Sequence, residues 1–205
     1  MKQERLESLL TTIDRLKVTT VNQLARIHDL GGYRNACRVV SQLAPYTHQY
    51  RELEKIIYLN KEGRALIGST KEVKRTPIIQ HTLLANEAYI YLDCPRDWTL
   101  EVELEQGKGL NFNLGGTITA TKKVVADAVF TRNGYVHLVE IDNIRDMKDN
   151  MKKIVNYKDI WKDIEKNYKL QPILYFFTTS SNRKSKLEGA LRSVRSKVLT
   201  FDEIR

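Results

Sequence analysis

Two runs of β-forming residues flank an Asn-Gly pair, and this pattern constrains the fold more than any other feature of the sequence. Residues 124–130 precede Asn133-Gly134, and residues 135–142 follow it. Asn-Gly favours a type I′ turn, whose twist matches that of two antiparallel strands. The sequence therefore predicts a β-hairpin whose side chains alternate between two faces.

Three carboxylates lie on this predicted hairpin. Asp127 belongs to the first strand, and Glu140 and Asp142 share one face of the second because they are two residues apart. If the three converge, they repel one another unless a cation lies between them, and carboxylate oxygens suit Mg²⁺ or Mn²⁺. The structural alternative is a set of exposed strand-end acids that pair with Lys and Arg of the following helix.

The surrounding sequence predicts a mixed α/β domain. A glycine-rich stretch, 107–116, lacks the context of a phosphate-binding motif and is interpreted as a mobile hairpin loop. Hydrophobic periodicity and turn residues predict the other elements: helix 78–92, strand 99–105, the hairpin, helix 146–168, strand 173–178, helix 183–194 and strand 197–201.

The first part of the chain has the pattern of a winged helix-turn-helix. Helices are expected at 4–17, 21–28 and 33–43, strands at 46–50 and 55–60, and a closing helix at 61–68. A glycine-containing turn before the third helix is typical of helix-turn-helix modules, whose last helix lies in the DNA major groove. A plain three-helix module that recognises protein is the alternative.

Charge favours DNA as the partner of this region. Residues 1–75 contain 14 Lys or Arg against 8 Asp or Glu, whereas residues 76–205 contain 20 against 17. A basic domain attracts a polyanion because neutralised phosphates release counterions. The candidate contacts on the third helix and the wing are Arg34, Asn35, Arg38, Ser41, Gln42, Arg51 and Lys55.

Two domains fit the chain of 205 residues, since domains usually contain about 100 to 150 residues. Residues 69–77 are charged and lack apolar periodicity, so they are interpreted as a linker between a DNA-binding domain, 1–70, and an α/β domain, 77–205.

Charges interrupt the leucines of the N-terminus, and no apolar run reaches the ~20 residues of a membrane helix. The expected location is the cytoplasm. Cys37 and Cys94 fit neither a zinc site nor a disulfide framework.

The order of these features resembles a known family. The resemblance is carried by the stretches Leu59-Asn60-Lys61-Glu62-Gly63-Arg64, Leu92-Asp93-Cys94-Pro95, Ala126-Asp127-Ala128, Val139-Glu140-Ile141-Asp142-Asn143, Lys152-Lys153-Ile154 and Tyr157. The second domain resembles the PD-(D/E)xK nuclease core, which is the fold of restriction endonucleases. The whole chain resembles the replication-relaxation proteins of plasmids and mobile elements, which join a winged helix-turn-helix to such a core.

This resemblance implies a metal-dependent nuclease site, but the sequence departs from its motif. Asp142 stands where active members have a lysine, and Ala126 stands where they have the proline. An anion cannot stabilise the pentacovalent phosphate as a cation does. Lys152 or Lys153 could reach back from the next helix to supply the charge, and Glu87 could add a ligand.

The prediction is therefore a double-stranded-DNA-binding accessory or regulatory protein of a plasmid or mobile element, acting in replication, mobilisation or transcription control. Its nuclease-like domain is expected to be degenerate. One alternative is a Mg²⁺- or Mn²⁺-dependent endonuclease or nickase that uses Asp127, Glu140, Asp142 and Lys152. Another is an adaptor for a relaxase or replication initiator. A homodimer is plausible because helix-turn-helix proteins often read two half-sites.

Overall fold

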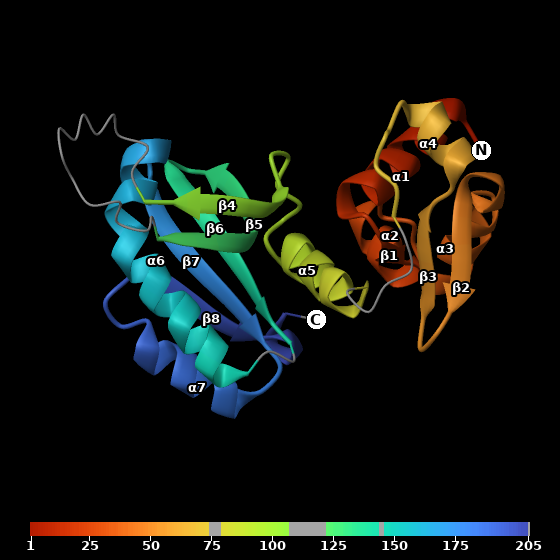
Figure 1. Ribbon diagram of the computed structural model, residues 1–205. Coiled ribbons are helices and arrows are strands. Elements are labelled where there is room, and N and C mark those ends of the chain that lie inside the picture. The colour runs from red at the N-terminus through yellow and green to blue at the C-terminus, as the bar shows by residue number, and fades with distance from the viewer. Residues whose placement is uncertain (74–78, 107–121, 144–145, 205) are drawn as a thin grey trace. The chain divides into compact units, whose positions relative to one another are not determined.

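The chain folds into two compact units of mixed α and β structure, Met1–Cys94 and Pro95–Arg205 (Figure 1). The structure is a computed structural model that describes residues 1–73, 79–106, 122–143 and 146–204. The glycine-rich stretch 107–116 lies outside these residues. None of the described helices is long and apolar enough to cross a membrane.

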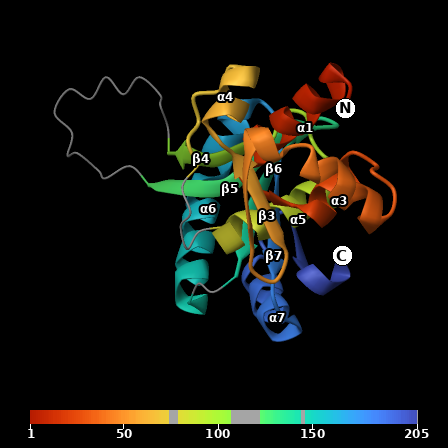
Figure 2. The same ribbon diagram turned by 90° about the vertical axis from the view of Figure 1, so that its right-hand side faces the viewer.

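The first unit combines helices with a small antiparallel sheet whose strand order is β1-β3-β2. Its elements are α1 (Gln3–Leu16), β1 (Thr19–Thr20), α2 (Val21–Ile27), α3 (Tyr33–Ser41), a 3-10 turn (Ala44–Tyr46), β2 (Thr47–Arg51), β3 (Lys55–Leu59), α4 (Lys61–Ile67) and α5 (Ile79–Tyr91). Leucine, isoleucine and valine side chains of α1, α2, α3 and β3 form its core. The hairpin of β2 and β3 is a narrow ribbon whose turn points away from α4 (Figures 1 and 2).

Local sequence explains where α2 begins and ends. Thr20 accepts a hydrogen bond from the backbone N–H of Gln23, and the Gln23 side chain accepts one from the N–H of Thr20, which is a capping box. After the helix, Asp29 and Gly31 adopt positive φ angles of 46° and 70°. Asp29 is therefore the left-handed residue nearest the end of α2, and Gly31 follows it in the turn before α3.

Helix α5 packs on the first unit through polar contacts. Gln23 Nε2 donates to Glu87 Oε1 at 2.8 Å, and Arg26 Nη1 donates to Glu87 Oε2 at 2.6 Å. Asn86 Nδ2 donates to the carbonyl oxygen of Val18 at 2.7 Å. The two compact units thus divide after Cys94, whereas the boundary expected from the sequence lies before this helix.

The start of the expected linker also belongs to the first unit. Ser69 Oγ donates to Asp14 Oδ1 at 2.5 Å, and Lys71 Nζ lies 3.6 Å from Asp14 Oδ2. Val73 packs against the small apolar cluster of Val18, Ile56 and Ile79. These contacts attach residues 69–73 to α1 and to the small sheet.

The second unit is a five-stranded mixed sheet with the order β4-β5-β6-β7-β8. Its elements are β4 (Thr99–Glu105), β5 (Lys123–Arg132), β6 (Tyr135–Asp142), α6 (Met147–Tyr168), β7 (Gln171–Thr178), α7 (Ser181–Ala190), β8 (Ser196–Thr200) and a final 3-10 turn (Phe201–Glu203). Strands β4, β5 and β6 are antiparallel neighbours, whereas β6, β7 and β8 run parallel. Apolar side chains of α6 and α7 share one core with one face of this sheet.

The hairpin that joins β5 to β6 confirms the prediction from Asn-Gly. Asn133 and Gly134 have φ angles of 51° and 78°, the positive values that a type I′ turn requires. Arg132 pairs with Tyr135, and the register continues to Ala128 opposite Val139. Residues Val136, Leu138, Glu140 and Asp142 therefore face α6, which fixes the side of the sheet on which two of the carboxylates lie.

Candidate functional site

Helix α3 presents a basic face to solvent. Its other face is apolar and buried, with Ala36, Val39 and Val40 in the core of the first unit. Arg34 and Arg38 are four residues apart and both exposed, so they project from the same side of the helix. Neither arginine forms an ion pair within the described part of the chain, which leaves both charges available to a partner.

The other polar residues predicted on α3 make local hydrogen bonds. Asn35 Nδ2 donates to the carbonyl oxygen of Leu30 at 2.7 Å, and its Oδ1 accepts a hydrogen bond from Arg38 Nη2 at 2.8 Å. Ser41 Oγ and Gln42 Nε2 both donate to the carbonyl oxygen of Arg38. Asn35 thus positions both the start of α3 and the Arg38 guanidinium.

The turn of the β2–β3 hairpin carries charges of both signs. Arg51 and Lys55 are directly opposite each other in the register, and like charges in such a pair destabilise a hairpin unless an anion lies near them. Glu52 and Glu54 flank a 96% exposed Leu53 at the turn. Gln80 Nε2 of α5 donates to Glu52 Oε2 at 3.1 Å.

Tyr33 belongs to the same surface, although the sequence gave no reason to select it. Its side chain is 63% exposed at the first position of α3. A hydrogen bond with Cys37 raises the pKa of the Tyr33 hydroxyl, and the charges of Arg51 and Glu54 also act on it.

A second cluster lies where β5 separates from β6. The ladder between these strands ends at the pair of Ala128 and Val139. Asp127 precedes Ala128 in β5, and its side chain takes the place of a backbone acceptor for β6. Asp127 Oδ2 accepts a hydrogen bond from the Ile141 N–H at 2.7 Å. This divergence, here called the strand fork, places Asp127 beside Glu140 of β6.

Helix α6 supplies a cation and a hydroxyl to the strand fork. Lys153 Nζ lies 2.5 Å from Glu140 Oε2 and 3.9 Å from Asp127 Oδ1. Tyr157 Oη donates to Glu140 Oε1 at 2.5 Å. Both oxygens of Glu140 are therefore engaged by α6, and one lysine lies between the two acids.

Burial gives Glu140 unusual acid–base behaviour. Burial and, next, the negative charge of Asp127 raise the pKa of Glu140 to about 8, against the opposing effects of Lys153 and Tyr157. Its side chain is only 2% exposed. Glu140 is thus the group of the strand fork at which a proton is gained or lost near neutral pH.

Asp142 does not belong to the strand fork. Its side chain is 0% exposed and is held by Arg183 of α7, whose Nε and Nη2 atoms lie 2.7 and 2.5 Å from the two carboxylate oxygens. Thr178 Oγ1 and Asn150 Nδ2 also donate to this carboxylate, at 2.6 and 2.7 Å. These hydrogen bonds hold the pKa of Asp142 below its ordinary value although burial acts in the opposite direction.

The structure therefore separates the residues that the sequence grouped as one site. Asp127 and Glu140 share a lysine, which is Lys153, while the neighbouring Lys152 is exposed. Glu87 lies in the first unit with Arg26 and Gln23 and adds no ligand here. Across the residues that the structure describes, no group of three or more His, Cys, Asp or Glu could hold a metal ion.

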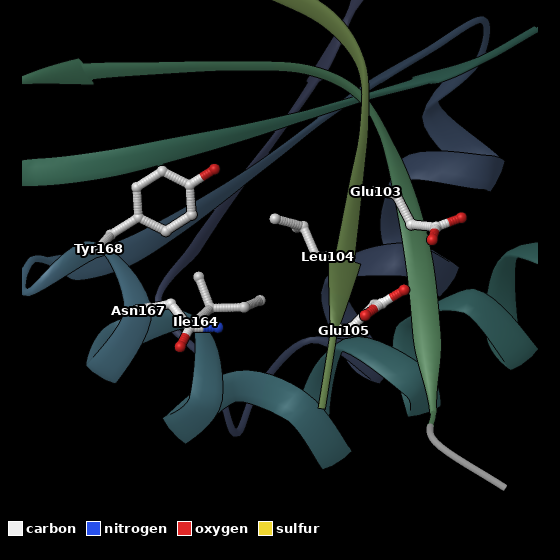
Figure 3. A pocket seen from close by; sticks show the side chains of 6 residues that line it. All are labelled: Glu103, Leu104, Glu105, Ile164, Asn167 and Tyr168. Carbon is white, nitrogen blue, oxygen red and sulfur yellow. The ribbon is translucent and has the colours of Figure 1, made fainter. Parts of the chain in front are cut away.

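Among the described residues of the second unit, two hollows bear on the site. One of about 360 Å³ is lined by Asp127 and Lys153 together with Lys123, Lys152 and Asn156 among others, but not by Glu140. The other, of about 380 Å³, lies between β4 and the end of α6. Figure 3 shows Leu104, Ile164 and the Tyr168 ring facing this second hollow, while the Glu103 carboxylate points away from it. Of these two hollows, the first adjoins the strand fork.

These features define a two-unit mixed α+β protein with an exposed basic helix face in one unit and a buried carboxylate–lysine cluster in the other. Residues 10–174 match the profile of the replication-relaxation family. The chain belongs to this family. No curated protein matches it in sequence.

One solved structure shows a distant similarity, the crystal structure of protein VC1899 from Vibrio cholerae. The two chains have 17% sequence identity and a TM-score of 0.40. The alignment covers 98% of this chain and 49% of that protein, so this chain spans about half of its length.

Proposed function

We propose that this chain is a double-stranded-DNA-binding accessory or regulatory protein of a plasmid or related mobile element, acting in replication, mobilisation or transcription control. Its first unit binds DNA as a winged helix-turn-helix. Its second unit is a PD-(D/E)xK-like domain that does not cleave DNA. Membership of the replication-relaxation family supports the plasmid setting.

The order of elements in the first unit supports the winged helix-turn-helix. Helices α1, α2 and α3 are followed by the β2–β3 hairpin, and β3 also pairs with the short strand β1. In modules of this kind the last helix enters the major groove. Helix α3 is then the recognition helix, and the hairpin is the wing.

One observation carries the proposal: Arg34 and Arg38 are exposed on one side of α3, and neither is neutralised by an acid of the described chain. Arginine binds phosphates and the O6 and N7 atoms of guanine with two hydrogen bonds at once. Because the opposite side of α3 is part of the core, the helix can bind DNA through this face without unfolding.

The hairpin adds contacts from Arg51 and Lys55, the pair that closes its acidic turn. Arg51 and Lys55 repel each other across the two strands, and a DNA phosphate between them would relieve this repulsion. Glu52 and Glu54 would be repelled by the DNA backbone, so the turn itself stays outside the duplex.

A mobility-shift assay on DNA flanking the gene tests the proposal. We expect the double variant Arg34→Ala/Arg38→Ala to lose specific binding, because each arginine contact to a base contributes about 1 to 3 kcal/mol. The matched control is Lys162→Ala/Lys166→Ala, which removes two exposed charges at the same spacing from α6. Wild-type affinity in the Arg34→Ala/Arg38→Ala variant would show that α3 is not the recognition helix.

Salt dependence distinguishes DNA binding from the adaptor role. Each phosphate contact releases counterions, so the logarithm of the binding constant should fall linearly with the logarithm of salt concentration, with a slope near −0.9 per contact. An adaptor for a relaxase or replication initiator would show no such DNA binding. Sedimentation of the protein with and without DNA would test the homodimer.

The nuclease alternative makes the opposite prediction for the second unit. A Mg²⁺- or Mn²⁺-dependent nickase would relax supercoiled plasmid and would lose this activity in Asp127→Asn or Glu140→Gln. We expect wild-type protein to leave the plasmid supercoiled, since Asp142 is bound to Arg183 and leaves no catalytic lysine at that position.

A further inference from the structure

The PD-(D/E)xK-like fold proposed above for the second unit implies a divalent metal at the strand fork, and the residues present do not fit one. The inference rests on that proposed fold. Such an ion needs carboxylate oxygens with free lone pairs and a net negative charge around it. The relevant test is therefore how the oxygens of Asp127 and Glu140 are used.

The oxygen atoms are already engaged by groups of the chain itself. Glu140 accepts hydrogen bonds from Lys153 on Oε2 and from Tyr157 on Oε1, both at 2.5 Å. Asp127 Oδ2 accepts from the Ile141 N–H, and its Oδ1 faces Lys153 at 3.9 Å. A metal ion between the two acids would have to displace the Lys153 ammonium.

The charges also disfavour a divalent ion. The Lys153 side chain is 12% exposed and Glu140 only 2%, so solvent screens their interaction weakly. Together, Lys153 and the two acids carry at most one net negative charge. A dication added to Lys153 would leave an excess of positive charge in a buried site, which is costly.

From this geometry we infer that Lys153 is a built-in cation that occupies the metal position of the strand fork, so that the second unit binds no divalent metal there. Lys153 also lines the hollow of about 360 Å³, whereas Glu140 does not. The lysine therefore lies between the buried acid and the opening through which an ion would enter. The inference concerns the second unit alone and holds whether or not α3 binds DNA.

Manganese binding tests this inference directly, without any measurement of nuclease activity. Mn²⁺ is titrated into the full chain and followed by electron paramagnetic resonance, which reports free Mn²⁺, and by the shift in melting temperature. We expect wild-type protein to take up no Mn²⁺ at this site. Uptake of one Mn²⁺ that Asp127→Asn or Glu140→Gln removes would overturn the inference.

The Lys153→Met variant is expected to bind Mn²⁺ where the wild-type protein does not. Methionine keeps most of the side-chain volume but removes the charge, so Asp127 loses its nearby cation and Glu140 loses its hydrogen bond on Oε2. The variant should therefore melt at a lower temperature, and it should recover when Mn²⁺ displaces the Glu140 proton and binds both acids. Adding Glu140→Gln should abolish that recovery. Lys152→Met is the matched control, because Lys152 lines the same hollow and is exposed, and it should show neither effect.

A folded Lys153→Met protein that takes up no Mn²⁺ would also overturn the inference, since the lysine would then not occupy a cation position. If Lys153→Met does not fold, the comparison between wild type and Glu140→Gln decides. Equal absence of Mn²⁺ binding in both supports the inference, and binding by wild type alone contradicts it.

Discussion

Positive charges have different surroundings in the two units. On α3 and the hairpin, Arg34, Arg38 and Arg51 are exposed and form no ion pairs within the described chain. In the second unit, Lys153 and Arg183 are bound to the buried acids Glu140 and Asp142. The contrast shows that residue type alone does not identify a binding site: an exposed cation can meet a polyanion, whereas a buried one is used to hold the fold together.

The largest effect is expected where this internal pairing is broken by reversing a charge. In Asp142→Lys, an ammonium ion would face Arg183 in a site where the native side chain is 0% exposed. Removing one member of a buried pair costs about 3 to 5 kcal/mol, so the variant should unfold at much lower urea concentration and should not gain nicking activity. The control Asp149→Lys makes the same change at an exposed position of α6 and should cost less than about 1 kcal/mol. A stable Asp142→Lys protein would show that the Arg183 pair is unimportant.

The second prediction concerns where the DNA-binding unit ends. Fragment 1–94 keeps α5, whereas fragment 1–75 loses it and exposes the surface that Ile79 and Leu83 cover in the cluster of Val18 and Ile56. Two apolar side chains at about 1.5 kcal/mol each give a loss of about 3 kcal/mol. We expect 1–94 to fold and bind DNA and 1–75 to be less stable, as measured by circular dichroism during urea unfolding. Equal stability of the two fragments would place the boundary in residues 69–77 instead.

The third prediction uses the acid–base behaviour of Glu140. Its pKa of about 8 in the folded protein exceeds its ordinary value of 4.5, so the folded state holds a proton that the unfolded chain releases. Stability should therefore fall as pH rises between these values, by at most about 1.4 kcal/mol per pH unit. The difference in unfolding free energy between Glu140→Gln and wild type isolates this contribution, because other groups cancel, and should favour the variant increasingly up to pH 8. A difference that does not vary with pH would show that Glu140 is already ionised at pH 5.

The sequence predicted most of the fold because local signals decide it. The Asn133-Gly134 turn and the hairpin register that follows from it depend on a few neighbouring residues, and both are present in the structure. The two-residue strand β1 was not predicted, since two threonines carry no periodicity.

The sites were predicted only in part, because they depend on contacts between distant segments. Asp142 and Arg183 are 41 residues apart, and no local pattern indicates that they pair. The sequence left open whether Lys152 or Lys153 faces the acids. Neighbouring residues of a helix point about 100° apart, so the orientation of the helix decides which of the two does. A signal did exist: Lys153 precedes Tyr157 by four residues and therefore lies on the same side of α6.

The smallest effect is expected for one cation of the hairpin, and it tests whether the exposed charges act as phosphate contacts. Arg51→Ala should weaken binding to all DNA sequences alike and reduce the slope of the salt dependence by about 1, since a phosphate contact carries no sequence information. It should also relieve the repulsion with Lys55 and leave the unit at least as stable as before. The control is Lys61→Ala, an exposed lysine that follows the other end of the hairpin and should leave the slope unchanged. If Arg51→Ala loses discrimination between specific and random DNA, this arginine is a base contact instead. If the slope of the salt dependence is unchanged, the hairpin does not belong to the DNA interface and α3 binds DNA alone.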